Sequence, residues 1–194
     1  SSHGNSVVFI SDANNLVAND TNNQADVFVK NLLTGDVKLV SASASGEIAD
    51  GASAHVSFSA DGRYVAFQTH AINLIAGLDT NATETNLYRK DLLTGEILAI
   101  DTSASGVSGN LRGEYPSLSA DGRYAVFTSQ ANNLVANDTN NDFDVFVKDM
   151  LTGDIRMIST HADGTQFSGF SYVNRYNTAS ISADGNTIVF EATD

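Results

Sequence analysis

A short loop rich in oxygen-bearing side chains recurs in the sequence, and its residues are the best suited to chemistry. The first copy reads DTNNQAD from Asp20, and the last reads DTNNDFD from Asp138. Carboxylate or amide groups stand at positions 1, 3 and 7, which a tight loop can bring together. Calcium takes about 6–8 hard oxygen ligands of this kind at about 2.3–2.6 Å. The predicted calcium ligands are Asp20, Asn22, Asp26, Asp138, Asn140 and Asp144.

The middle copy of this loop is degenerate. It reads DTNATETN from Asp79 to Asn86, so it is one residue longer and ends on an amide. Its candidate ligands, Asp79 and Asn81, predict a weaker or empty site. In the first and last copies, by contrast, two carboxylates supplemented by amides predict a calcium dissociation constant of about 10⁻⁴–10⁻³ M. The alternative is a network of Asx turns, in which Asp and Asn cap their own loop backbone without metal.

A second candidate site is an aromatic segment at residues 165–177, which reads TQFSGFSYVNRYN. Flat rings beside amides and an arginine suit recognition of a sugar or a peptide. The alternative is that these rings pack in the interior, as most aromatic side chains do. The candidate ligand-binding residues here are Phe170, Tyr172, Arg175 and Tyr176.

Catalytic residues are not predicted. The sequence contains no Gly-x-Ser-x-Gly motif for a nucleophilic serine. Its four histidines occupy non-equivalent positions and form no pair with metal-ligand spacing. These histidines are His3, His55, His70 and His161.

The elements that position these loops come from an internal repeat. The segments SADGRYVAF, SADGRYAVF and SADGNTIVF begin at Ser59, Ser119 and Ser182. The repeats cover approximately residues 4–61, 62–121 and 122–184, with a partial repeat at 185–194. Repeats of this length predict one supersecondary unit per repeat, with neighbouring units stacked on one another.

Each repeat reads as four short strands, labelled A to D, with tight turns at Asp-Gly and Thr-Gly. Taking one example of each strand from different repeats, we expect strand A at 115–119, strand B at 63–69, strand C at 26–32 and strand D at 37–41. Strands B and C carry apolar side chains at consecutive positions, as in YVAF and VFV. A sheet wetted on one side would alternate. Apolar surfaces on both sides predict sheets sandwiched between neighbouring sheets, as in a β-propeller.

The hairpin Ser-x-Asp-Gly-Arg-Tyr-x-x-Phe, followed by a strand C that ends in Leu-Thr-Gly, resembles the TolB-like (WD40-like) β-propeller repeat. The resemblance covers nearly the whole chain, although Ala60, Ala120 and Ala183 replace a proline usual in the family. It implies an all-β fold of about three four-stranded blades. Such a chain is either a partial propeller or half of an oligomeric ring.

The composition of the chain disfavours two classes of binding partner. The 194 residues carry a net charge of −13 and no cysteine. This charge disfavours nucleic acid and anionic membrane surfaces. No run of about 20 apolar residues is present, so membrane insertion is not expected.

These features predict a non-catalytic propeller module that binds or scaffolds, and that calcium stabilises. We expect it in an extracellular, cell-surface or periplasmic protein, with a protein or carbohydrate ligand on the face that carries the B–C and D–A loops. The alternative is the propeller portion of an enzyme, such as a polysaccharide lyase or a peptidase gated by its propeller. The exposed outer blades predict a homodimer that completes a six-bladed ring, and a piece of a longer propeller is the competing account.

Overall fold

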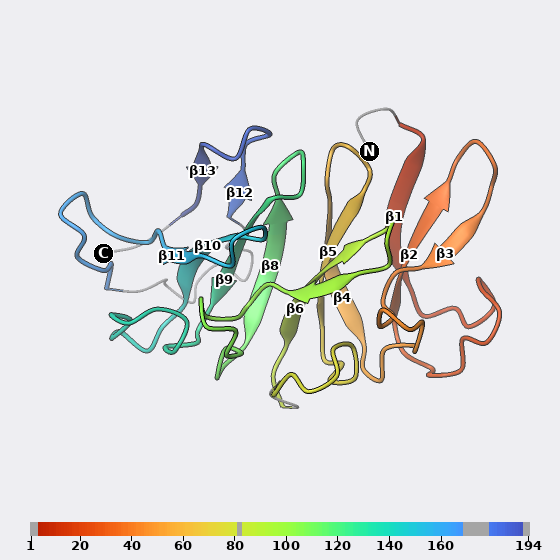
Figure 1. Ribbon diagram of the computed structural model, residues 1–194, viewed down its shortest axis with the longest axis horizontal. Coiled ribbons are helices and arrows are strands. Elements are labelled where there is room, and N and C mark those ends of the chain that lie inside the picture. The colour runs from red at the N-terminus through yellow and green to blue at the C-terminus, as the bar shows by residue number, and fades with distance from the viewer. Residues whose placement is uncertain (1–3, 81–82, 169–178, 192–194) are drawn as a thin grey trace.

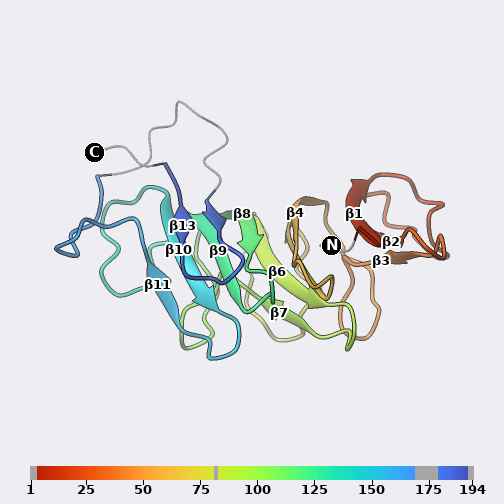
Figure 2. The same ribbon diagram turned by 90° about the horizontal axis from the view of Figure 1, so that it is seen from above.

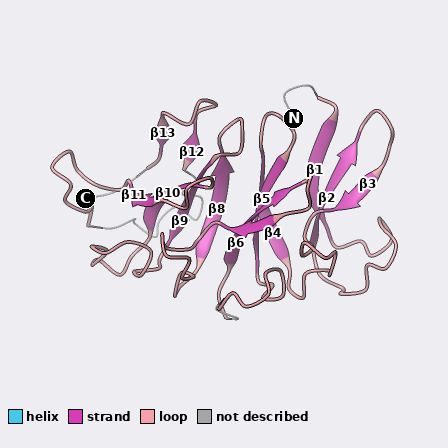
Figure 3. Cartoon of the chain, in the orientation of Figure 1, coloured by secondary structure: helices cyan, strands magenta, loops and turns pink. Residues whose placement is uncertain are grey.

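The structure is a computed structural model that describes residues 4–80, 83–168 and 179–191. Within these ranges the regular elements are all β-strands, arranged as a row of antiparallel sheets (Figure 3). This confirms the predicted all-β class and the four-stranded blades.

Four sheets follow one another along the chain (Figure 1). Blade 1 consists of β1 (Ser6–Ser11), β2 (Asp26–Asn31) and β3 (Val37–Leu39). Blade 2 consists of β4 (Ser53–Phe58), β5 (Tyr64–Thr69), β6 (Asn86–Asp91) and β7 (Ile97–Ala99). Blade 3 consists of β8 (Gly113–Leu118), β9 (Tyr124–Ser129), β10 (Asp144–Asp149) and β11 (Ile155–Met157). A final pair consists of β12 (Ser180–Ile181) and β13 (Ile188–Val189). Strands C and D end one or two residues earlier than expected.

The core lies between the blades, as the two-sided apolar strands predict. Consecutive residues Val65, Ala66 and Phe67 of β5 are all fully buried. Phe67 packs in the cluster that joins blades 1 and 2, whereas Ala66 packs in the cluster that joins blades 2 and 3. Each central strand therefore serves two interfaces, and this is why it cannot alternate between apolar and polar residues.

The two kinds of connection lie at opposite ends of the blades. Figure 1 shows the β2–β3, β8–β9 and β12–β13 hairpins along the upper edge and the long loops that follow β1, β5 and β9 along the lower edge. The D–A segments after β3 and β7 also run along the lower edge. We call this side, formed by residues 14–26, 41–55 and their equivalents, the loop face.

Candidate functional site

The first repeated loop brings two carboxylates into a buried position. Asp26 begins β2 and is fully buried, and its Oδ1 accepts a hydrogen bond from Ser41 Oγ at 2.5 Å. Asp20 is only 8% exposed, and its Oδ1 is buried without a hydrogen-bond partner. A buried carboxylate oxygen without a donor is costly unless a charge compensates it.

Asn22 lies between these two carboxylates in the chain and connects them to the neighbouring loop. Its Nδ2 donates to Asp26 Oδ2 at 2.7 Å and to the Ala49 carbonyl at 3.0 Å. Its Oδ1 accepts from the Gln24 N–H at 3.0 Å, which is an Asx turn. In this arrangement the amide nitrogen faces the carboxylate. Ligation through Asn22 Oδ1 would therefore require the amide to turn over.

The third loop has the same frame with one added donor. Ser159 Oγ donates to Asp144 Oδ1 at 2.5 Å, as Ser41 does to Asp26. The Gln166 amide nitrogen donates to Asp138 Oδ1 at 3.0 Å and to Asp144 Oδ2 at 2.8 Å. The other oxygen of Asp138, Oδ2, is buried without a partner. Gln166 therefore bridges the two carboxylates from within the protein.

The first loop lacks this bridge because of one residue. Isolated β-bridges pair Ala42 with Ile48 in the first D–A loop and Thr160 with Gln166 in the third, so Ile48 occupies the position of Gln166. An isoleucine side chain cannot donate a hydrogen bond. The space between Asp20 and Asp26 is thus better suited to a cation than the equivalent space in the third loop.

The carboxylates repel one another in both loops. Burial raises the pKa of Asp26, hydrogen bonds from Ser41 and Asn22 oppose this, and the Asp20 carboxylate raises the pKa further. Burial likewise raises the pKa of Asp144, and the Asp138 carboxylate adds to the effect. Burial also raises the pKa of Asp138. A cation between each pair would relieve both the burial cost and the repulsion.

The middle loop is built differently. Asp79 is exposed, whereas Asp20 is buried, and Asn81 lies outside the described residues. Asn86 begins β6 in place of Asp26, and Asp101 stands in place of Ser41. The carboxylate has therefore moved from the strand to the opposing loop. The sequence shows this exchange only when the strand C and D–A positions are compared together, and our sequence-based prediction missed Asp101.

These donors limit the chemistry of the loops. In the ranges that the structure describes, no group of three His, Asp or Glu side chains forms a cluster that could hold a metal ion. A cation at Asp20 and Asp26 would need further oxygens from amides, loop carbonyls and water. This donor set fits calcium, which accepts all of them, better than a transition metal.

Paired asparagines hold the loops of the loop face together. In the third repeat, Asn133 Nδ2 donates to the Ser108 carbonyl at 2.9 Å, and its Oδ1 accepts from the Asn110 N–H at 3.0 Å. Asn110 Nδ2 in turn donates to Asn132 Oδ1 at 2.9 Å. Asn73 and Asp50 form the same connection one repeat earlier. Much of the asparagine in the repeat thus serves to join the B–C loop to the D–A loop.

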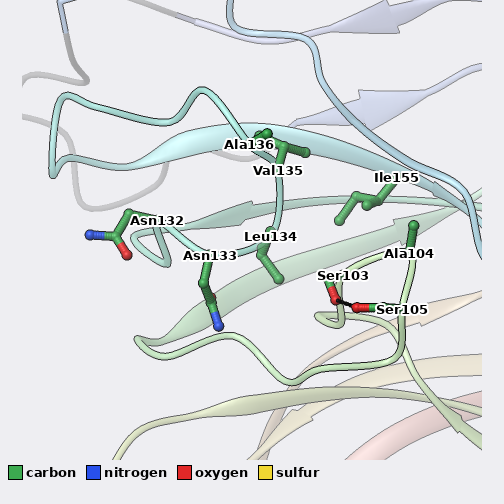
Figure 4. A pocket seen from close by; sticks show the side chains of 9 residues that line it. All are labelled: Ser103, Ala104, Ser105, Asn132, Asn133, Leu134, Val135, Ala136 and Ile155. Atoms are coloured by element: carbon green, nitrogen blue, oxygen red, sulfur yellow. Dashed lines mark hydrogen bonds between the residues drawn. The ribbon is translucent and has the colours of Figure 1, made fainter.

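A depression of about 640 Å³ lies beside this connection, between the D–A turn at 103–105 and the B–C loop at 132–136 (Figure 4). Its wall includes the hydroxyls of Ser103 and Ser105, which lie 3.0 Å apart, and the apolar side chains of Leu134 and Ile155. Hydroxyl and amide groups beside apolar surface are suited to a polar ligand.

The predicted aromatic site cannot be placed. Phe170, Tyr172, Arg175 and Tyr176 all lie outside the described residues. Phe167, which precedes them, is described, and its ring lies 4.5 Å from the His161 ring and 6.4 Å from the Phe190 ring, measured between centroids.

His55, one of the four histidines, lies in a β-bulge of β4. It is exposed, with a φ of +43°, and the equivalent Tyr115 of β8 has a φ of +54°. Their ring centroids are 4.4 Å apart. A left-handed backbone at bulky residues is uncommon, and bulges redirect side chains. Here the bulges of two neighbouring blades bring the two rings into contact.

Comparison with solved structures identifies the fold. TolB from Acinetobacter baumannii superimposes with a TM-score of 0.54 at 18% identity, over 97% of this chain and 35% of that one. A TolB-like protein from Agrobacterium tumefaciens gives 0.53 at 16% identity, over all of this chain and 57% of that one. The fold is that of a TolB-like β-propeller.

The propeller blades of other proteins are also similar. An oligogalacturonate lyase in complex with manganese has a TM-score of 0.50 at 15% identity, over 96% of this chain and 41% of that one. The chain therefore spans between about a third and somewhat over half of the length of these proteins. No family model and no curated protein sequence matches it. At these identities the likeness shows the fold alone. Among the described residues, no helix could span a membrane.

Proposed function

We propose that this TolB-like propeller is a non-catalytic binding module whose loop face is stabilised by calcium. The observation that carries the proposal is the buried Asp20 Oδ1, which has no hydrogen-bond donor, in a carboxylate whose charge raises the pKa of the buried Asp26. Calcium bound there would satisfy this oxygen and offset the repulsion between the two carboxylates. It would also connect the B–C loop to β2.

The third loop is a second, weaker site. Its carboxylates Asp138 and Asp144 already share the Gln166 amide, which calcium would have to displace. Weak sites of about 10⁻⁴–10⁻³ M suit compartments rich in calcium. This supports an extracellular, cell-surface or periplasmic location.

The ligand is a protein or a carbohydrate bound on the loop face. Long loops on a rigid scaffold are the usual place for binding residues. Here the asparagine connections hold neighbouring loops in a fixed relation beside the depression at Ser103 and Asn133. Calcium would contribute by keeping those loops ordered rather than by contacting the ligand.

Calcium at roughly 10–100 times its dissociation constant is expected to stabilise the folded chain by about 1–3 kcal/mol, because the ligands converge only when the loop is folded. This corresponds to a rise in melting temperature of roughly 2–4 °C per kcal/mol for a chain of this size. The measurement is a pair of thermal melts, one in EDTA and one in millimolar calcium. An identical melting temperature in both would sink the calcium proposal and leave the Asx-turn network as the account.

Asp20→Asn assigns the effect to the first loop. The variant should lose most of the calcium stabilisation, yet it should be no less stable than the native chain in EDTA, since it removes a negative charge whose Oδ1 is buried without a hydrogen-bond donor. Asp79→Asn is the matched control, because Asp79 holds the same loop position but is exposed. Equal calcium responses in the two variants would show that Asp20 is not a ligand.

A further inference from the structure

The outward side of blade 1 carries residues that the other blades bury. Val7 of β1 is 41% exposed, whereas the equivalent Val65 and Ala125 are fully buried against the preceding blade. Lys30 of β2 is exposed, whereas the equivalent Lys90 and Lys148 are 8% and 4% exposed. This surface is therefore built as an inter-blade interface, and it lies at one end of the row of sheets.

The buried lysines show what this interface requires. Lys90 Nζ donates to the carbonyls of Ala42 and Ser43 in the preceding blade, at 2.7 and 2.9 Å. Lys148 Nζ donates to the Thr102 carbonyl and hydroxyl, at 2.5 and 2.6 Å. In blades 2 and 3, a lysine of strand C thus donates hydrogen bonds to the D–A turn of the preceding blade. The corresponding turn of blade 3 contains Thr160 and His161.

A second recurring contact joins a tyrosine to the next Asp-Gly turn. A Cβ on Gly122 would lie 2.4 Å from Tyr64 Cδ2, and one on Gly185 would lie 2.5 Å from Tyr124 Cδ2. Each tyrosine ring therefore lies directly on the glycine of the following blade. Gly4 is the equivalent glycine of blade 1, with a φ of +64°, and nothing lies within 4 Å of its would-be Cβ.

The surface of blade 3 that could receive blade 1 of another copy is at the other end of the chain. Behind blade 3 lie β12 and β13, and β13 pairs with β12 through two residue pairs only. The sequence GNTIVF, which contains β13, closely matches GNSVVF at residues 4–9, which contains the start of β1. However, β1 is already paired with β2 over six residues. Ile188 and Phe190 pack on Val126, Val145 and Val147 of blade 3, and Val7 and Phe9 are their counterparts.

We propose that two copies of this chain close into a ring by strand exchange. Blade 1 of each copy takes the place of β13 in the other copy and pairs its β1 with the partner copy's β12. Tyr124 of one copy then covers Gly4 of the other, and Lys30 reaches the carbonyls of Thr160 and His161. Each copy's β12 becomes strand A of the partner copy's three-stranded blade.

This exchange makes two equivalent junctions related by a twofold axis. It yields six complete four-stranded blades, within the range of about 4–8 for closed propellers. It also buries the exposed Val7 and pairs the open edge of β1, and both changes favour association. The occupant is a second copy, since its residues 4–9 match residues 185–190, which cover blade 3 within one chain, and its Lys30 adds the strand C lysine of the other blade junctions.

Light scattering on the purified chain gives the first test. We expect a dimer of twice the 20.5 kDa chain mass at micromolar concentration. Lys30→Ala should weaken the dimer at least tenfold, because charged hydrogen bonds to two carbonyls are lost at both junctions. Lys38→Ala, at an exposed lysine of the neighbouring strand, should leave the dimer unchanged.

Engineered cysteines test the exchange itself, and the sequence contains no native cysteine to interfere. Ile181 faces Ile188 next to the hydrogen bond from Ser182 N to Thr187 O, so this is a closely spaced, non-hydrogen-bonded pair. The double variant I181C/I188C should oxidise within one chain, hold β13 in place and yield a monomer. The double variant V7C/I181C should oxidise to a covalent dimer, since β1 belongs to the first sheet of the chain, whereas β12 belongs to the last sheet together with β13 (Figure 2).

Either of two results would overturn the proposal. One is a native chain that stays monomeric at tens of micromolar with no covalent dimer from V7C/I181C. The other is a dimer that survives both Lys30→Ala and closure of the engineered disulfide in I181C/I188C, because its interface would then lie elsewhere.

Discussion

The Gly122→Ala variant is expected to lose about 3 kcal/mol of folding free energy, from two separate causes. Gly122 has a left-handed backbone with a φ of +67°, which costs an alanine roughly 1–2 kcal/mol. The added methyl group would also lie 2.4 Å from Tyr64 Cδ2, and overpacking of this kind typically costs about 1–3 kcal/mol. Tyr64 cannot move away easily, since Arg89 lies over its ring at 4.4 Å and donates to the Gly122 carbonyl.

Gly153→Ala separates the two causes. Gly153 has a φ of +83° but open space around its would-be Cβ, so only the backbone cost of roughly 1–2 kcal/mol should remain. The measurement is urea unfolding of both variants beside the native chain. Equal losses of unfolding free energy in the two variants would show that the contact between Tyr64 and the turn of blade 3 is loosely packed. The contact would then contribute little to the stability of the fold.

The Asp101→Asn variant should be more stable than the native chain at pH 8 by about 4 kcal/mol, and equally stable near pH 4. Burial raises the pKa of Asp101 to about 7, from 3.8, although backbone N–H groups of Leu87 and Asp101 donate hydrogen bonds to it and the Lys148 charge attracts it. An acid whose folded pKa is raised contributes its stability below pH 4 and loses it as the pH rises to about 7. Asparagine mimics the protonated acid and does not titrate.

The difference in folding free energy between Asp101→Asn and the native chain isolates the effect of Asp101. The raised pKa values of Asp26, Asp138 and Asp144 change the pH dependence of stability in both proteins alike. Burial lowers the pKa of Lys148 to about 8, and the Asp101 charge opposes this shift, so in the native chain the effect of Lys148 falls between pH 8 and 10.5 and has the opposite sign. Asp12→Asn, at an exposed position, is the control. Parallel stability profiles for Asp101→Asn and the native chain between pH 4 and 8 would contradict the assignment.

The sequence predicts the blades because their pattern is local. Strands such as Tyr64–Thr69 show their two buried sides as consecutive apolar residues, and the Asp-Gly and Thr-Gly turns mark the hairpins. The ends of the strands are less predictable. Strand D was expected to reach Ser41, but β3 ends at Leu39, because Ser41 instead bonds Asp26 and the Val27 N–H through its hydroxyl.

Contacts between repeats are harder to predict, because they depend on which blade lies next to which. Lys30, Lys90 and Lys148 hold the same repeat position, yet among the described residues only the last two are covered by a neighbouring blade. The role of Gln166 as a bridge between Asp138 and Asp144 depends on a D–A loop 22 to 28 residues away. No sequence spacing connects Gln166 with Asp138 and Asp144. The sequence therefore predicts the two carboxylates as calcium ligands but not the Gln166 amide that competes for them.

Calorimetric titration of calcium into the native chain, Asp20→Asn and Asp79→Asn measures directly whether Asp20 binds calcium. We expect binding to the native chain with a dissociation constant of about 10⁻⁴–10⁻³ M. Asp20→Asn should lose the tighter binding event, while Asp79→Asn should retain it. If the native chain binds no calcium up to several millimolar, the calcium site does not exist, and the repeated Asp and Asn loops are self-capping turns.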